Sequence, residues 1–170
     1  MANDLVSLAD RLGQHLLRSG HMLALAESCT GGWIAQSVTE IAGSSAWFDR
    51  GFVTYSNAAK IALLDVREIT LQQHGAVSPQ TACEMVGGAL KHSDADIVLA
   101  VTGIAGPGGG TAEKPVGLVF LAWQVRGQPC RCLEQHFEGD RHEIRRQTVL
   151  KALRCLLGEY QAGDIPSDQP

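Results

Sequence analysis

Residues 22–32, MLALAESCTGG, join a short apolar run to a polar turn that ends in two glycines. The apolar run over 22–26 has the length and composition of a buried strand. The segment that follows the turn, residues 32–42, has apolar side chains at helical spacing. A buried strand that passes through a turn directly into a helix is typical of α/β sheets. We therefore expect residues 22–42 to form one strand–turn–helix unit of such a sheet.

The rest of the chain alternates between the same two kinds of pattern. Further strands are expected at 47–55, 96–103, 116–125 and 130–137, and further helices at 5–20, 56–66, 78–92 and 140–160. Strands separated by helices favour a sheet covered on both faces. The sequence thus predicts an α/β fold, a three-layer α/β/α sandwich with a mixed, partly parallel sheet of about five to six strands. We expect one domain over 1–160 and a disordered tail over 161–170.

Composition excludes several classes of protein. The chain has 170 residues, 45% of them hydrophobic, and a formal net charge of −4. No apolar run approaches the roughly 18 to 20 residues that span a bilayer, so no membrane association is expected. The acidic balance argues against nucleic-acid binding. Five cysteines in an unpatterned set favour reduced thiols in the cytoplasm, and the scattered histidines predict no metal site.

Three polar segments each follow a predicted strand. They are AESCTGG (26–32), TYSNAAK (54–60) and VTGIAGPGGG (101–110). In open α/β sheets, ligands bind beyond the carboxyl ends of the strands. We therefore expect these segments to share one functional site.

The first segment contains two possible nucleophiles, Ser28 and Cys29. Free backbone N–H groups at a helix start favour a developing negative charge and lower the pKa of a thiol. Spacing alone also allows a simpler interpretation, in which Ser28 or Thr30 merely caps the helix. Both interpretations of the serine stay open at this point, and Cys29 is the competing nucleophile.

The other two segments offer partners for such a nucleophile. Lys60 could serve as the base if burial lowered its pKa, and Tyr55 could relay a proton or position the lysine. A solvated lysine and a strand-end tyrosine are the ordinary alternatives. Thr102 could hydrogen-bond a ligand, although the glycine-rich loop after it lacks the ending of a P-loop. Arg141, near a predicted helix start, could bind a phosphate or carboxylate, or lie free on the surface.

Taken together, five segments resemble the CinA C-terminal domain family, which includes stand-alone nicotinamide-nucleotide amidases. The matching segments are AESCTGG (26–32), FDRGFVTYSNAAK (48–60), GAVS (75–78), VTGIAGPGGGTAEKPVG (101–117) and GDRHEIRRQ (139–147). The resemblance implies deamidation of nicotinamide mononucleotide (NMN) to nicotinate mononucleotide and ammonia, in pyridine nucleotide (NAD) recycling. It also implies an enzyme without a cofactor, and a homo-oligomer for which a dimer is the first expectation.

The resemblance further implies roles for individual residues. Catalysis would fall to Ser28 as nucleophile and Lys60 as base, with Tyr55 assisting. The substrate-binding positions would be Thr30, Gly31, Gly32, Thr102, Gly103, Gly106 and Arg141, and the backbone amides of Cys29, Thr30 and Gly31 would hold the oxyanion. Two alternatives remain open, an amidase that uses Cys29 as its nucleophile and a non-catalytic nucleotide-binding paralogue.

Overall fold

The computed structural model describes residues 2–163, with side chains described over 4–159. Five strands form one sheet in the order β2-β1-β3-β4-β5. They are β1 (Leu23–Glu27), β2 (Phe48–Val53), β3 (Ile97–Gly103), β4 (Leu118–Val125) and β5 (Arg131–His136). β1 pairs in parallel with both β2 and β3, whereas the β3–β4 and β4–β5 pairs are antiparallel. The predicted mixed, partly parallel sheet is confirmed.

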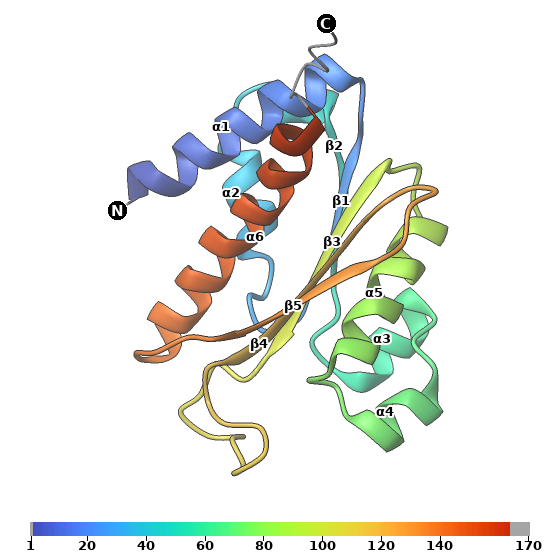
Figure 1. Cartoon of the computed structure of the whole chain (residues 1–170), viewed down its shortest axis with the longest axis vertical. Helices are drawn as coiled ribbons and strands as arrows, with labels where there is room; N and C mark the ends of the chain where they lie inside the picture. The colour runs from blue at the N-terminus through green and yellow to red at the C-terminus, as the bar shows by residue number, and fades with distance from the viewer. Residues whose placement is uncertain (1, 164–170) are drawn as a thin grey trace, which may run out of the picture.

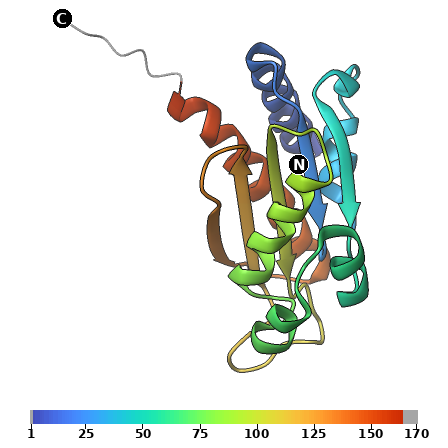
Figure 2. The ribbon, with the colours of Figure 1, turned by 90° about the vertical axis from the view of Figure 1, so that its right-hand side faces the viewer.

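Helices cover both faces of this sheet. One layer consists of α1 (Ala2–Ser19), α2 (Trp33–Thr39) and α6 (Arg141–Gly163), and the other of α3 (Asn57–Leu64), α4 (Glu68–His74) and α5 (Pro79–Lys91), as Figure 1 shows. In Figure 2 the green helices α3 to α5 lie in front of the sheet and the red α6 lies behind it. A short 3₁₀ helix, η1 (Ser44–Ala46), precedes β2. The predicted three-layer α/β/α sandwich is therefore confirmed.

The alternation of side chains along β1 supplies both layers of the core. Leu23 and Leu25 face the layer of α1, α2 and α6, and Ala24 and Ala26 face α5. All four are fully buried. Because both faces of a central parallel strand are covered, its sequence is a continuous apolar run. On the α5 side, a Cβ at Gly88 would lie 1.9 Å from the Leu64 carbonyl oxygen, so this glycine lets α5 contact the end of α3 directly.

Helix ends follow the predicted caps in most places. Ser56 and Ser78 accept from the third backbone amide of α3 and α5, at 3.0 and 3.2 Å. Asp140 Oδ1 accepts from the Glu143 amide at 2.9 Å, but the Glu143 carboxylate pairs with Arg146 instead of closing a capping box. The predicted caps thus locate these three helix starts correctly.

Two features of the helices differ from the expectation. α4 was not predicted, because only Thr70 and Leu71 of its seven residues are buried and the segment lacks an apolar stripe. α6 extends to Gly163, so residues 161–163, expected in a disordered tail, are helical, and the rest of that tail (164–170) lies outside the described residues. Within residues 2–163, no helix has the length and apolar character needed to cross a membrane.

Candidate active site

The three polar segments meet at the carboxyl ends of the parallel strands. The Ser28 amide donates to the Val101 carbonyl at 3.1 Å, and the Thr54 amide donates to the Glu27 carbonyl at 2.8 Å. These bonds continue the parallel ladders of β1 with β3 and with β2 just past the strand ends. The carboxyl ends of three adjacent parallel strands therefore place residues 28, 54 and 102 beside one another, as expected from the sequence.

Ser28 and Lys60 are in direct contact at this edge. Lys60 Nζ donates to Ser28 Oγ at 3.0 Å and to the Thr54 carbonyl at 2.6 Å. Lys60 lies four residues before Leu64 on α3, so the two side chains share one face of the helix. Both are buried. The hydrogen bond to the Thr54 carbonyl gives the amine a second fixed partner besides the serine hydroxyl. The sequence interpretation of Lys60 as a solvated lysine is therefore wrong.

Burial also changes the chemistry of this amine. Lys60 is 1% exposed, and it forms no ion pair with a carboxylate of the described residues. Loss of hydration lowers the pKa of Lys60 from 10.5 to about 8, against a small opposing effect of Cys29. Roughly a tenth of the amine is then neutral at pH 7, some two to three orders of magnitude more than for an ordinary lysine. Lys60 is thus suited to accept a proton near neutral pH.

Cys29 has the opposite environment. Its side chain is 6% exposed and packs in the core between the sheet and α2. Burial raises the pKa of the Cys29 thiol to about 12, so almost none of it is thiolate at neutral pH. A buried neutral thiol is a poor nucleophile, which favours Ser28 over Cys29 for that role.

Glu27, which precedes the serine, caps α2. Its carboxylate is 1% exposed and accepts from the backbone amides of Gly32 and Ile34 at 3.0 and 3.1 Å, from that of Ala35 at 2.8 Å and from the Thr30 hydroxyl at 2.6 Å. The interpretation of Ser28 or Thr30 as the helix cap is therefore wrong. A buried carboxylate at a helix N-terminus satisfies the amides that would otherwise lack acceptors. Sequence reasoning missed Glu27, although a carboxylate directly before the turn of residues 28–32 was visible.

Replacing Glu27 by Gln is expected to destabilise the fold by about 2–4 kcal/mol, because three amides and a hydroxyl lose a charged acceptor. The melting temperature should fall by about 5–15 °C in a chain of this size. Differential scanning calorimetry measures this shift. Glu40→Gln is the matched control, because Glu40 is exposed at the other end of α2. Equal shifts for the two variants would contradict the capping role.

The backbone amides near Ser28 are only partly available for an oxyanion. The Gly31 amide donates to the Ser28 carbonyl at 3.0 Å, closing a tight turn in which Gly31 has a φ of 62°. The helix-start amides of Gly32, Ile34 and Ala35 are bound to Glu27. Among the described residues, the amides of Cys29 and Thr30 have no hydrogen-bond acceptor outside their own residue. The expected set of three amides is thus reduced to these two.

Arg145 donates to backbone carbonyls of the turn over residues 28–32. It was not predicted as a site residue. Its Nε donates to the Cys29 carbonyl at 3.1 Å and one of its terminal nitrogens donates to the Thr30 carbonyl at 2.8 Å. Its guanidinium also lies over the Trp33 ring, 5.3 Å from the centroid. Because these carbonyls point toward Arg145, the amides of the turn point elsewhere. The only signal in the sequence was a weak basic cluster formed by Arg141, Arg145 and Arg146.

Tyr55 and Arg141 are paired at the mouth of the site. One terminal nitrogen of Arg141 donates to the Tyr55 hydroxyl at 2.7 Å and the other donates to the Gly106 carbonyl at 2.7 Å. Tyr55 is 62% exposed, and its hydroxyl accepts from Arg141. Arg141 therefore links the segment after β2 to the glycine-rich loop after β3.

Thr102 and Gly103 end β3 under that loop. The buried Thr102 hydroxyl donates to the Ala76 carbonyl at 2.8 Å. This hydrogen bond connects the loop before α5 to the end of β3. A Cβ at Gly103 would lie 2.8 Å from the Leu118 carbonyl oxygen, so only glycine allows β4 to approach this closely. Both residues thus fix the end of β3 against its neighbours.

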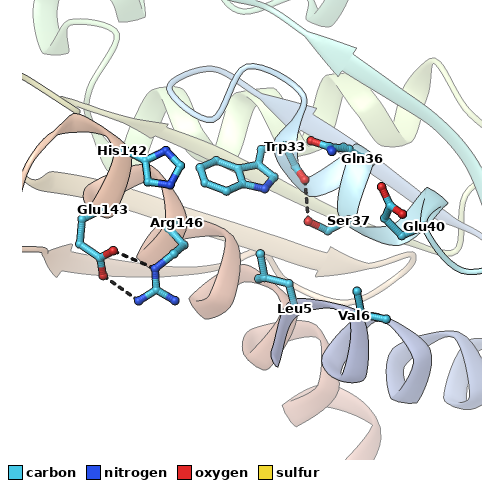
Figure 3. Close-up of a pocket in the computed structure, with 9 residues that line it drawn as sticks. All are labelled: Leu5, Val6, Trp33, Gln36, Ser37, Glu40, His142, Glu143 and Arg146. Carbon is cyan, nitrogen blue, oxygen red and sulfur yellow. Dashed lines mark hydrogen bonds and ion pairs between the residues drawn. The ribbon is translucent and has the colours of Figure 1, made fainter. Parts of the chain in front are cut away.

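Two neighbouring cavities lie beside Trp33, Gln36 and His142. One of about 320 Å³ is lined by Gly31, Gly32, Trp33, Gln36, His142 and Arg145. The other, of about 550 Å³, extends between α1, α2 and α6 (Figure 3). Neither cavity is lined by Ser28 or Lys60, so the dyad lies outside both of them. No group of three or more His, Cys, Asp or Glu side chains in the described part of the chain is arranged to hold a metal ion.

Comparison with known proteins connects this geometry to a family. The model described as the CinA C-terminal domain matches residues 5–160. The chain is 49% identical over 158 residues to the nicotinamide-nucleotide amidohydrolase PncC of Escherichia coli K12, covering 93% of this chain and 96% of that protein. It is 50% identical over 155 residues to the protein of the same name from Pseudomonas putida, covering 90% and 95%. The crystal structure of the competence/damage inducible protein CihA from Agrobacterium tumefaciens superposes with a TM-score of 0.89 at 52% identity, covering 91% of this chain and 94% of that one.

Proposed function

The chain belongs to the CinA C-terminal domain family, and from this premise we propose that it deamidates nicotinamide mononucleotide to nicotinate mononucleotide and ammonia. Similarity over nearly the whole chain to two proteins named nicotinamide-nucleotide amidohydrolase supports the reaction. The single observation on which the mechanism rests is the 3.0 Å contact between Lys60 Nζ and Ser28 Oγ, with the amine buried.

In the first half of the reaction, Ser28 is the nucleophile and Lys60 the base. The neutral amine keeps a donor on the Thr54 carbonyl and accepts the Ser28 proton with its lone pair. Oγ then attacks the carboxamide carbon, and the carbonyl oxygen becomes an oxyanion. The amides of Cys29 and Thr30 are the donors left to stabilise it.

In the second half, Lys60 passes the serine proton to the leaving group, and a proton from water then restores the serine. The Lys60 ammonium donates to the departing nitrogen, which leaves as ammonia, and an ester to Ser28 remains. A water molecule gives its proton to Lys60 and attacks the ester carbon. Return of that proton to Ser28 Oγ releases the nicotinate product, so the dyad ends as it began.

Arg141, the Tyr55 hydroxyl and the 103–110 loop are proposed to bind the phosphate and to orient the nucleotide. The Arg141 guanidinium is already fixed by the Tyr55 hydroxyl and the Gly106 carbonyl, and a fixed planar fork suits a phosphate oxygen pair. Thr102 and Gly103 support this loop from below. The mechanism uses no metal ion or organic cofactor.

The cellular setting is also a proposal. We place the reaction in pyridine nucleotide recycling in the cytoplasm and expect the protein to act as a homodimer. The resemblance to the CinA C-terminal domain family supports the recycling role and the homodimer, and the five unpatterned cysteines support the cytoplasm. Light scattering coupled to size-exclusion chromatography tests the second, since a dimer has twice the mass of one chain.

Release of ammonia from purified protein tests the proposed reaction. NMN is expected to be deamidated with a kcat/KM at least about tenfold above that for nicotinamide, because nicotinamide lacks the phosphate that Arg141 would bind with charge-assisted hydrogen bonds. A coupled glutamate dehydrogenase assay measures the ammonia, with NAD as a third substrate. Calorimetric binding of NMN without ammonia release would instead identify a non-catalytic nucleotide-binding paralogue.

A further inference from the structure

Three cysteine side chains from separate segments meet on the α5 side of the sheet. Cys83 belongs to α5, Cys132 to the edge strand β5, and Cys130 to the turn before that strand. The Cys130 thiol donates to Cys83 Sγ at 3.2 Å, and the nearby Cys132 thiol also lowers the pKa of Cys83. Cys83 is therefore the central thiol of the three. We refer to Cys83, Cys130 and Cys132 as the thiol cluster.

Small reagents can reach the thiol cluster from solvent. Cys83 and Cys130 are half-buried and Cys132 is exposed, whereas Cys29 is buried. None of the three cluster thiols takes part in the proposed deamidation. The cluster thus combines accessibility with close mutual contact, which the other two cysteines lack.

Hydrogen bonding within the thiol cluster favours one thiolate. The thiol donors of Cys130 and Cys132 lower the pKa of Cys83, and the same bonds raise the pKa of both donors. Burial, by contrast, raises the pKa of Cys29 and of Cys155. Thiolate is the form of cysteine that reacts with oxidants, so Cys83 is the first thiol expected to react.

The geometry also allows a second thiol to close a bond. A disulfide has sulfur atoms about 2.05 Å apart, so Cys83 and Cys130 need to approach by about 1.1 Å from 3.2 Å. Cys130 lies in a turn beside the edge of the sheet, where the backbone is bound on one side only. A shift of this size is within the range of side-chain rotation and turn movement.

We propose that the thiol cluster is an oxidation site for hydroperoxides, in which Cys83 is oxidised first and then forms a disulfide with Cys130. The Cys83 thiolate attacks the peroxide O–O bond, giving a sulfenic acid at Cys83 and, after protonation, an alcohol or water. The Cys130 thiol then attacks the sulfenic sulfur and a water molecule leaves. In total, two thiols and one hydroperoxide give one disulfide, one alcohol and one water, with two electrons passing from sulfur to the peroxide. This site is independent of the proposed deamidation.

Hydrogen peroxide and tryptic peptide mapping test the assignment. Cleavage after arginine and lysine separates the three cysteines into peptides 68–91, 127–131 and 132–141, because Arg131 lies between Cys130 and Cys132. The oxidised wild-type protein is expected to lose two of its five thiols and to yield peptide 68–91 linked to peptide 127–131. Reduction with dithiothreitol should restore both thiols.

Two serine variants separate this proposal from general oxidation. Cys83→Ser is expected to lose thiols at least about tenfold more slowly than the wild type, since Cys130 and Cys132 then lack their low-pKa neighbour. Cys155→Ser, in α6, should behave as the wild type does. Equal rates for wild type and Cys83→Ser would overturn the proposal. So would a main cross-link to peptide 132–141, or a disulfide between two chains on a non-reducing gel.

Discussion

Ser28→Ala is expected to lower kcat/KM for ammonia release from NMN by at least about 10³-fold, because it removes the atom that attacks the carboxamide. The fold should be retained. The Ser28 side chain accepts one hydrogen bond, from Lys60, and the lysine keeps its bond to the Thr54 carbonyl. Steady-state assays over a range of NMN concentrations measure kcat/KM, and the melting temperature verifies folding.

A matched control and a thiol reagent complete this experiment. Ser93→Ala, just after α5, removes a hydroxyl that donates to the Ala89 carbonyl and accepts from the Ala95 amide. The activity of this variant should equal that of the wild type. Iodoacetamide should leave wild-type activity intact, since the Cys29 thiol is buried and its pKa is raised. Wild-type activity in the Ser28→Ala variant would assign the nucleophile to Cys29 instead. So would inactivation of the wild type by iodoacetamide together with alkylation of Cys29.

The layered fold could be predicted because its pattern is local. The apolar run at 22–26 followed by a glycine turn and a helical stripe specifies strand, turn and helix within one short segment. Residues beyond neighbouring strand ends could be assigned to a common edge by topology alone. For the same reason Ser28 and Lys60, which are 32 positions apart, could be placed together before any contact was known.

What the sequence could not predict depends on contacts across the fold. Arg145 binds the carbonyls of Cys29 and Thr30, more than a hundred positions away, and its place in a weak basic cluster does not predict this contact. A hydroxyl cap for α2 stayed open because Ser and Thr are common caps, yet it is the buried Glu27 carboxylate that accepts from three amides at the start of this helix. Cys130 and Cys132 could be assigned to one sheet face, but their partner Cys83 comes from a helix whose register is set by packing.

The burial of Lys60 has a thermodynamic consequence that connects stability with catalysis. The folded chain binds the lysine proton less tightly than the unfolded chain, because the pKa falls from 10.5 to about 8 on folding. Unfolding therefore takes up a proton between these two pH values, and the contribution of this group to stability rises as pH increases through that range. A lysine kept at this cost to stability is consistent with a role as a base, since an apolar side chain would pack there more favourably.

Lys60→Met is expected to lower kcat/KM for NMN by about 10²–10⁴-fold, the usual contribution of a positioned general base. Wild-type kcat/KM should rise about tenfold per pH unit below pH 8 and level off above it, because the neutral amine is the active form and the pKa of Lys60 is about 8. The remaining kcat/KM of Lys60→Met should not show this rise with pH. Assays from pH 6 to pH 9.5 in buffers of constant ionic strength measure both profiles.

Lys60→Arg is the matched control for charge, because it keeps a cation near Ser28 but cannot lose its proton in this pH range. Its kcat/KM should fall by a similar factor and show no inflection near pH 8. Lys60→Met should be at least as stable as the wild type at pH 7, since methionine fills the same buried position without a desolvated charge. Any loss of activity in that variant then reflects the missing base rather than unfolding. A Lys60→Arg variant with wild-type activity, or a wild-type profile that is flat from pH 6 to pH 9, would exclude Lys60 as the base and leave it the role of a cation that holds Ser28 in place.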